Sequence, residues 1–101
     1  MNTTDHVVKL LKIVAKHFHM SQDELFNKTR DVRTIQARAA ATKVLRDIMT
    51  LSYPQLAHVF KQTHGASHNA YKRANEWLRT DRNFRRSFVA LESELRKRGE
   101  L

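Results

Sequence analysis

The 101-residue sequence predicts an all-α fold, a compact bundle of about six helices that contains a helix-turn-helix. Three observations support this prediction. Only two Gly and one Pro interrupt the chain, and β-branched residues nowhere alternate with polar ones over the length of a strand. Apolar residues instead recur at the spacing of a helix that buries one side. Since no linker or repeat divides the sequence, residues 1–101 are expected to form a single domain.

The N-terminal half predicts three helices. The first carries an apolar stripe from Val7 to Phe18. Ser21 and Glu24 have the spacing of a capping box, which indicates a short second helix ending near Asn27. After the polar, basic joint 27–33, a long third helix is expected, and its run of three Ala favours close approach of neighbouring helices.

A helix-turn-helix is predicted over residues 52–79. Ser52 and Gln55 form a second capping box, and Pro54 lies in the first turn, where its missing amide costs little. A short helix is followed by a polar turn that contains Gly65 and then by a fifth helix. The inward positions of that helix are Ala70, Ala74, Trp77 and Leu78.

The last helix is expected over about 81–98, with Thr80 or Asp81 as its cap. Its apolar stripe consists of Phe84, Phe88, Leu91 and Leu95. This stripe either completes the core or forms a dimer contact, and we expect it to complete the core. A monomer and a homodimer both stay open.

The charge distribution points to a polyanionic partner. The chain has 19 Lys and Arg against 10 Asp and Glu, a formal net charge of +9. Residues 1–27 are neutral overall, whereas the basic residues concentrate in 28–46 and 72–98, on either side of most of the helix-turn-helix. Such placement favours a phosphate-binding surface over the alternatives, a merely soluble basic protein or a binder of anionic lipid.

The start of the fifth helix has the residue types that read base edges. Asn pairs with adenine, and Ser and His donate to or accept from bases, while Lys and Arg reach phosphate or guanine. The competing interpretation is an ordinary solvated helix face with Ser67 as its cap. The residues from which we expect sequence preference are Thr63, His64, Ser67, His68 and Asn69. Those from which we expect affinity are Arg30, Arg33, Arg38, Arg46, Lys72 and Arg73.

Catalysis, a metal site and a cofactor are not expected. The chain has no Cys, and no acidic residue lies beside His64 and His68, so this pair falls short of a metal site. Its glycines, Gly65 and Gly99, cannot form a phosphate loop. No small-molecule substrate is evident. No apolar run is long enough for a membrane span, and the N-terminus lacks the pattern of a secretory signal, which together predict a cytoplasmic protein.

The stretch from about Val7 to Leu78 resembles the C-terminal DNA-binding domain of the bacterial replication initiator DnaA. The matching segments are 14–18 (Val-Ala-Lys-His-Phe), 23–26 (Asp-Glu-Leu-Phe), the joint 27–30, Arg38 with the Ala-rich helix, 44–48, 50–56 and 59–60. The resemblance implies a Trp-repressor-like fold in which the helix-turn-helix reads the major groove. It also implies that Arg30 enters the minor groove, that Arg38, Arg46 and Pro54 contact the DNA backbone, and that 63–67 hold the base readers.

The proposed reading residues depart from that family. It typically carries Gly-Gly-Arg-Asp-His in the turn, where this chain has Lys-Gln-Thr-His-Gly at 61–65. We therefore expect a sequence-specific double-stranded DNA-binding protein with its own target, acting as a regulator of transcription or replication in a bacterial cytoplasm or nucleoid, or encoded by a phage. The alternative is an interaction module that reuses the fold to bind an acidic partner or the replication machinery. Single-strand RNA recognition is disfavoured because few exposed aromatic residues are available for base stacking.

Overall fold

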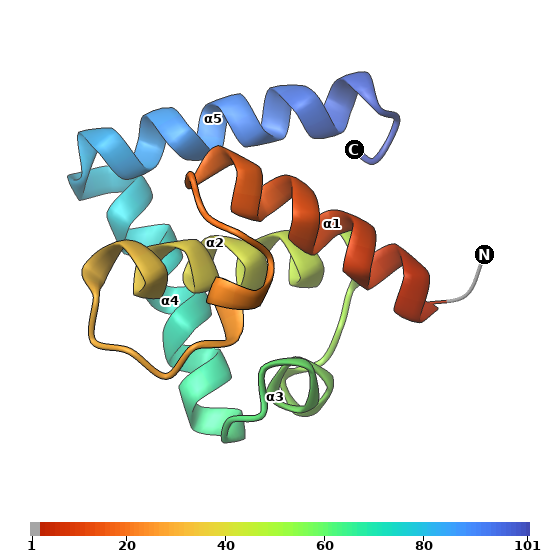
Figure 1. Cartoon of the computed structure of the whole chain (residues 1–101), viewed down its shortest axis with the longest axis vertical. Coiled ribbons are helices and arrows are strands. Elements are labelled where there is room, and N and C mark those ends of the chain that lie inside the picture. The colour runs from red at the N-terminus through yellow and green to blue at the C-terminus, as the bar shows by residue number, and fades with distance from the viewer. Residues whose placement is uncertain (1–2) are drawn as a thin grey trace.

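The computed structural model describes residues 3–101 and shows a helical bundle (Figure 1). Its elements are α1 (Thr3–His17), the 3₁₀ helix η1 (Asp23–Phe26), α2 (Val32–Met49), α3 (Tyr53–Phe60), α4 (His64–Thr80) and α5 (Arg82–Lys97). The described part of the chain contains no strand, which confirms the all-α prediction. None of its helices has the length and apolarity needed to cross a bilayer.

The short second of the six predicted helices is a 3₁₀ helix, and the other five helices of the described residues are α-helices. Its amides donate to the carbonyl three residues earlier, as in the bond from Leu25 N to Gln22 O at 3.1 Å. Ser21 and Glu24 do form the predicted reciprocal bonds, at 3.3 and 3.4 Å. Four residues are too few for a stable α-helix, and fully buried Leu25 fixes this short segment to the bundle.

Helix α2 is the centre of the core. Its Ala37, Ala39, Ala40 and Ala41 are at most 2% exposed, and the small side chains let α1 and α4 pack closely against it. Leu10 and Val14 of α1 are fully buried, so the predicted N-terminal stripe faces this core.

Helix α5 closes the bundle by crossing α1 and the end of α4 (Figure 1). All four residues of its apolar stripe are buried, at 0–3% exposure. Phe84 packs on Phe18, which directly follows α1, and on Trp77 of α4, with ring centroids 5.8 and 5.6 Å apart. The stripe thus completes the core of a single chain, as the sequence predicted, and is not available as a dimer contact.

Hydrogen-bonded caps fix where the later helices begin. Asp81 caps α5 by accepting from Phe84 N at 3.0 Å, and its other oxygen accepts from Gln36 Nε2 at 2.9 Å. These bonds lower the pKa of the Asp81 carboxyl. Ser52 and Gln55 form the predicted capping box of α3, with bonds of 2.8 and 3.2 Å. The Asp81 carboxylate, bonded to Gln36 and to Phe84 N, therefore ties α2 to the start of α5.

Candidate nucleic-acid interface

The turn between α3 and α4 is three residues long and is shaped by Lys61. Lys61 adopts the left-handed conformation with φ 52°, and its N–H donates to the last carbonyls of α3. Thr63 then caps α4, because its Oγ1 accepts from Ala66 N at 3.0 Å. Gly65, predicted in the turn, lies instead in the first turn of α4. The turn does not need a glycine because Lys61 takes the left-handed position.

Helix α4 exposes most of the predicted reading residues and buries one. Its exposed members among the predicted contacts are His64, His68, Asn69, Lys72 and Arg73. Thr63 is also exposed, although its hydroxyl is engaged in the cap. Ser67 is fully buried and accepts from Gln62 Nε2 at 3.1 Å, so its predicted contact with a base is wrong. Ser67 shares the inward face with Ala74, seven residues further along the helix.

The joint between η1 and α2 is held against the helix-turn-helix. Lys28 Nζ donates to Lys61 O at 3.0 Å, which links the joint directly to the turn. Asp31 caps α2 by accepting from Arg33 N at 3.1 Å. Arg30 and Arg33 are both exposed on this anchored segment. The sequence predicted the basic joint but not the bond that places it beside α4.

Arg38 is committed to the protein's own backbone. Its Nε donates to Leu25 O at 2.8 Å and its Nη2 donates to Asn27 O. Burial lowers the pKa of this guanidinium. Arg38 therefore anchors the joint to α2, a role that the sequence analysis missed because the partners are backbone carbonyls, which leave no sequence signal.

Arg46 also has intramolecular partners. It donates to Leu51 O at 2.9 Å and stacks over the ring of Tyr53, with 4.0 Å from Cζ to the centroid. Tyr53 contacts His68 and Tyr71 of α4 edge-on, at 4.9 and 6.3 Å between centroids. This cluster joins α2, α3 and the start of α4 and orients the exposed face of α4.

Tyr71 extends the cluster to the end of α2. Its hydroxyl donates to Asp47 at 2.8 Å, and that bond together with burial raises the pKa of Tyr71. Lys43 pairs with the same carboxylate at 2.9 Å and lies 5.0 Å from the Tyr71 ring. Tyr71 thus serves packing, and its ring is not free for base stacking.

A crevice of about 330 Å³ separates the joint from α4. Its polar lining comes from Thr29 and Arg38 on one side and from Asn69 and Arg73 on the other. The Arg73 guanidinium lies 5.0 Å from the ring of Trp77. Asn69, one of the predicted readers on α4, therefore borders the same depression as Arg38 of α2 and Thr29 of the joint.

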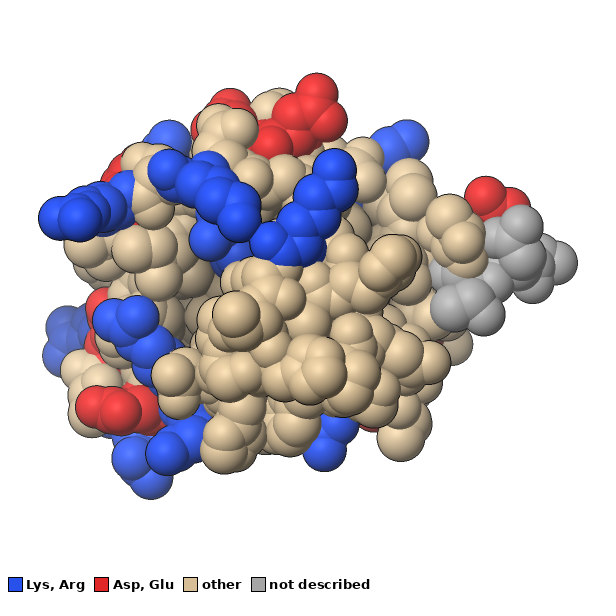
Figure 2. All heavy atoms as spheres, turned by 90° about the horizontal axis from the view of Figure 1, so that it is seen from below, with Lys and Arg blue, Asp and Glu red and all other residues tan. Residues whose placement is uncertain are grey.

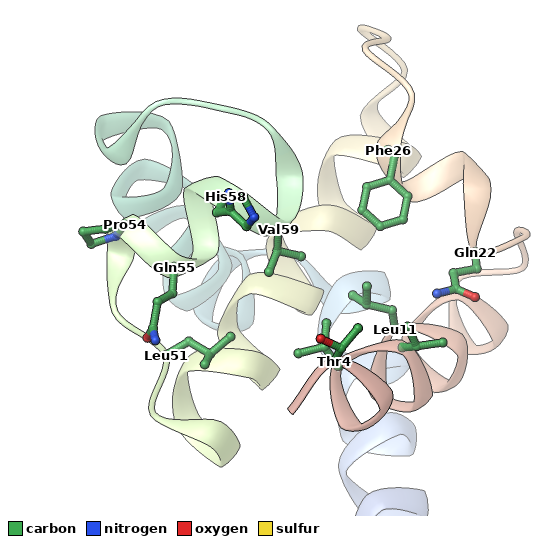
Figure 3. Close-up of a pocket in the computed structure, with 11 residues that line it drawn as sticks. Thr4, Leu11, Gln22, Phe26, Leu51, Pro54, Gln55, His58 and Val59 are labelled. Carbon is green, nitrogen blue, oxygen red and sulfur yellow. The ribbon is translucent and has the colours of Figure 1, made fainter. Parts of the chain in front are cut away.

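A second hollow, of about 620 Å³, lies between α1, η1 and α3, and Phe26 and Leu11 face Leu51 and Val59 across it (Figure 3). Apart from His58, the residues around it have no ionisable side chain. The hollow offers apolar contact and no constellation of catalytic groups.

Charge is distributed unevenly on the side of the molecule where α3 and the start of α4 lie. Seen from there, Lys and Arg gather on the left and near the centre, while a broad area without charged residues fills the right (Figure 2). A shallow hollow of about 690 Å³ lies beside the α3–α4 turn, and its lining includes Lys28, Lys61, Pro54 and His64. The basic joint and the turn thus face the same solvent region.

Comparison with known sequences agrees with this geometry. A family model of the bacterial DnaA protein helix-turn-helix matches residues 7–73, which include α1 to α3 and the first half of α4. The chain belongs to the DnaA helix-turn-helix family. The chromosomal replication initiator protein DnaA of Nautilia profundicola is 29% identical over 87 residues, which are 85% of this chain and 20% of that protein. The chain thus spans about a fifth of the length of this DnaA relative.

Membership of the DnaA helix-turn-helix family supports double-stranded DNA as a partner. Within this member, the predicted contacts divide by their surroundings. Arg30, Arg33, Lys72 and Arg73 are exposed, whereas Arg38 and Arg46 are held by carbonyl groups. Pro54 is exposed in the first turn of α3.

Proposed function

We propose that the chain is a sequence-specific double-stranded DNA-binding protein that regulates replication or transcription by occupying a site. The observation that supports this most is the exposed, polar first half of α4, within the segment that matches the DnaA helix-turn-helix. In the proposed complex the start of α4 enters the major groove.

Two groups of contacts share the proposed recognition. His64, His68 and Asn69 lie on the exposed side of α4 with donors and acceptors suited to base edges. Lys72 and Arg73 follow one turn later and suit phosphate. Arg30, carried by the anchored joint, reaches the neighbouring minor groove, whose negative potential attracts Arg.

The structure also assigns supporting roles within this proposal. Arg38 and Lys28 keep the joint at a fixed distance from α4, while Arg46 and Tyr53 orient α4 on the bundle. Preorganised contacts lose less conformational entropy on binding, so these side chains contribute to affinity even without touching DNA.

Selection of bound sites from a random duplex library at two salt concentrations tests the proposal. Lys72→Ala is expected to weaken binding to all duplexes and to reduce the salt slope by about 1. Asn69→Ala is expected to change the preferred sequence, with a cost of about 1–3 kcal/mol at one position.

Lys12→Ala on α1 is the matched control, because it removes the same charge from an exposed residue outside the helix-turn-helix. If Lys12→Ala weakens binding as much as Lys72→Ala, only net charge matters and the assigned face is wrong. If no duplex binds even at low salt, the DNA assignment fails and the alternative of an acidic protein partner gains support.

A further inference from the structure

The corner where α4 meets α5 lies away from the start of α4 (Figure 1), and three arginines of the sequence fall at this corner. Arg79 lies in the last turn of α4, and Arg82 and Arg86 lie one turn apart on α5, all exposed. We call these three residues the corner arginines. Within residues 3–101 their side chains form no hydrogen bond or ion pair. Three unpaired guanidinium groups on one corner make a strong local positive potential.

The acidic residue in this stretch is already engaged. Asp81 accepts from Phe84 N and from Gln36 Nε2, so its oxygens face the protein. Arg85 has a structural role, since its Nη1 donates to Leu78 O at 3.1 Å at the end of α4. The corner arginines have neither a neutralising partner nor a bond that the fold requires.

Their placement works against the stability of α5. The first turn of α5 holds no acidic residue, and cations there oppose the helix dipole. Arg82 and Arg86 are also a like-charged pair at a spacing that destabilises a helix. Residues that break local preferences without a compensating contact are expected to serve binding.

Arg33 adds to the same corner from a third element. It precedes Gln36 by one turn on α2, and Gln36 bonds to Asp81. The side chain of Arg33 is exposed. All four cations are Arg, whose planar fork matches phosphate oxygens in a bidentate way.

The corner arginines lie at the opposite end of α4 from the proposed base readers. The helix has 17 residues, so its ends are about 24 Å apart. With the start of α4 in a major groove, the corner points away from that duplex, across the bundle (Figure 1).

We infer that the corner arginines are a second phosphate-binding surface, which holds another DNA duplex while the start of α4 holds the first. This inference rests on the proposed function. It makes the chain a bridge between two DNA segments.

A capture assay tests the bridge. A biotinylated duplex carrying the selected site is fixed to beads, and a fluorescent second duplex is added with the protein. Wild-type protein is expected to retain the second duplex, and Arg82→Gln with Arg86→Gln is expected to lower this retention at least fivefold. Binding of the double variant to one duplex, measured by anisotropy, should stay within twofold of wild type.

The matched control is Arg96→Gln with Lys97→Gln, an equal charge loss from exposed residues at the other end of α5. Its retention should stay within twofold of wild type. The corner variant should melt at the same temperature as wild type or higher, because it relieves the unfavourable charges.

Four outcomes would overturn the inference. Undiminished retention by the corner variant means that two copies bridge through their helix-turn-helices. Absence of retention by the wild-type protein with intact single-duplex binding removes the second surface and leaves the proposed function standing. Binding of phosphatidylglycerol vesicles that depends on the corner arginines, without retention of DNA, makes the partner a lipid. Failure of single-duplex binding itself removes the proposed function and the bridge together.

Discussion

Replacing Gly65 with Ala should change the stability of the fold and the affinity for DNA in opposite directions. It lies in the first turn of α4 and is exposed, and a methyl group added at its Cα would meet only Thr63 Oγ1, at 4.0 Å. Because glycine costs about 1 kcal/mol relative to alanine in a helix interior, and less in the first turn, Gly65→Ala should stabilise the fold by about 0.5–1 kcal/mol.

For a domain of this size that gain corresponds to a melting temperature about 2–5 °C higher. The same methyl group would project from the helix end proposed to enter the major groove, so we expect DNA affinity to fall at least fivefold while stability rises. Thermal unfolding by circular dichroism and duplex binding by anisotropy measure the two effects on one sample. Ala66→Gly, the opposite exchange at the next position, should lower the melting temperature and confirms the sign of the stability term.

Each result can refute one part of this reasoning. A lower melting temperature for Gly65→Ala would mean that the space beside Gly65 is not open. An unchanged affinity would mean that DNA does not approach this part of α4 closely.

The remaining predictions concern a pair of arginines and one carboxylate. Arg38→Met should destabilise the fold by about 1–3 kcal/mol in urea unfolding, because the part-buried Leu25 carbonyl and the exposed Asn27 carbonyl both lose their donor. Arg30→Met removes no side-chain hydrogen bond or ion pair within residues 3–101, so it should change stability by less than about 0.5 kcal/mol yet weaken duplex binding, and equal stability losses would contradict the division of roles. Glu94 accepts from Lys16 at 3.0 Å, from His17 at 2.7 Å and from Arg98 at 2.8 Å, which lowers its pKa from 4.5 to about 2. Since the folded pKa lies below the unfolded one, this stabilisation is complete above pH 4.5 and is lost between about pH 4.5 and 2. Glu94→Gln should therefore cost about 1 kcal/mol at pH 7 and flatten the fall of stability over that range, and an unchanged acid profile would show that Glu94 does not link α1 to α5.

The sequence predicted what depends on local spacing. Apolar residues at helical intervals identified α1 and α5, and the Ser52–Gln55 box identified the start of α3. The sequence did not predict that η1 is a 3₁₀ helix of only four residues, since a capping box specifies where a helix starts but not the number of turns that follow.

What the sequence did not predict depends on distant partners. From the sequence, Arg38 was predicted to contact DNA. In the structure its guanidinium donates to Leu25 O and Asn27 O, across the joint. Ser67 looked exposed because small polar residues suit a helix start, but the α3–α4 turn directs it inward, onto Gln62. Backbone acceptors leave no trace in residue types, so such roles appear only with the fold.

Trp77, the chain's one tryptophan, connects the core with the crevice beside α4. The centroid of the Trp77 ring lies 5.6 Å from that of Phe84 in the core and 5.0 Å from the Arg73 guanidinium carbon. Its emission should shift when the bundle unfolds and change separately when a phosphate draws Arg73 off the ring. Trp77 fluorescence should therefore report both folding and occupancy of the crevice without an added dye.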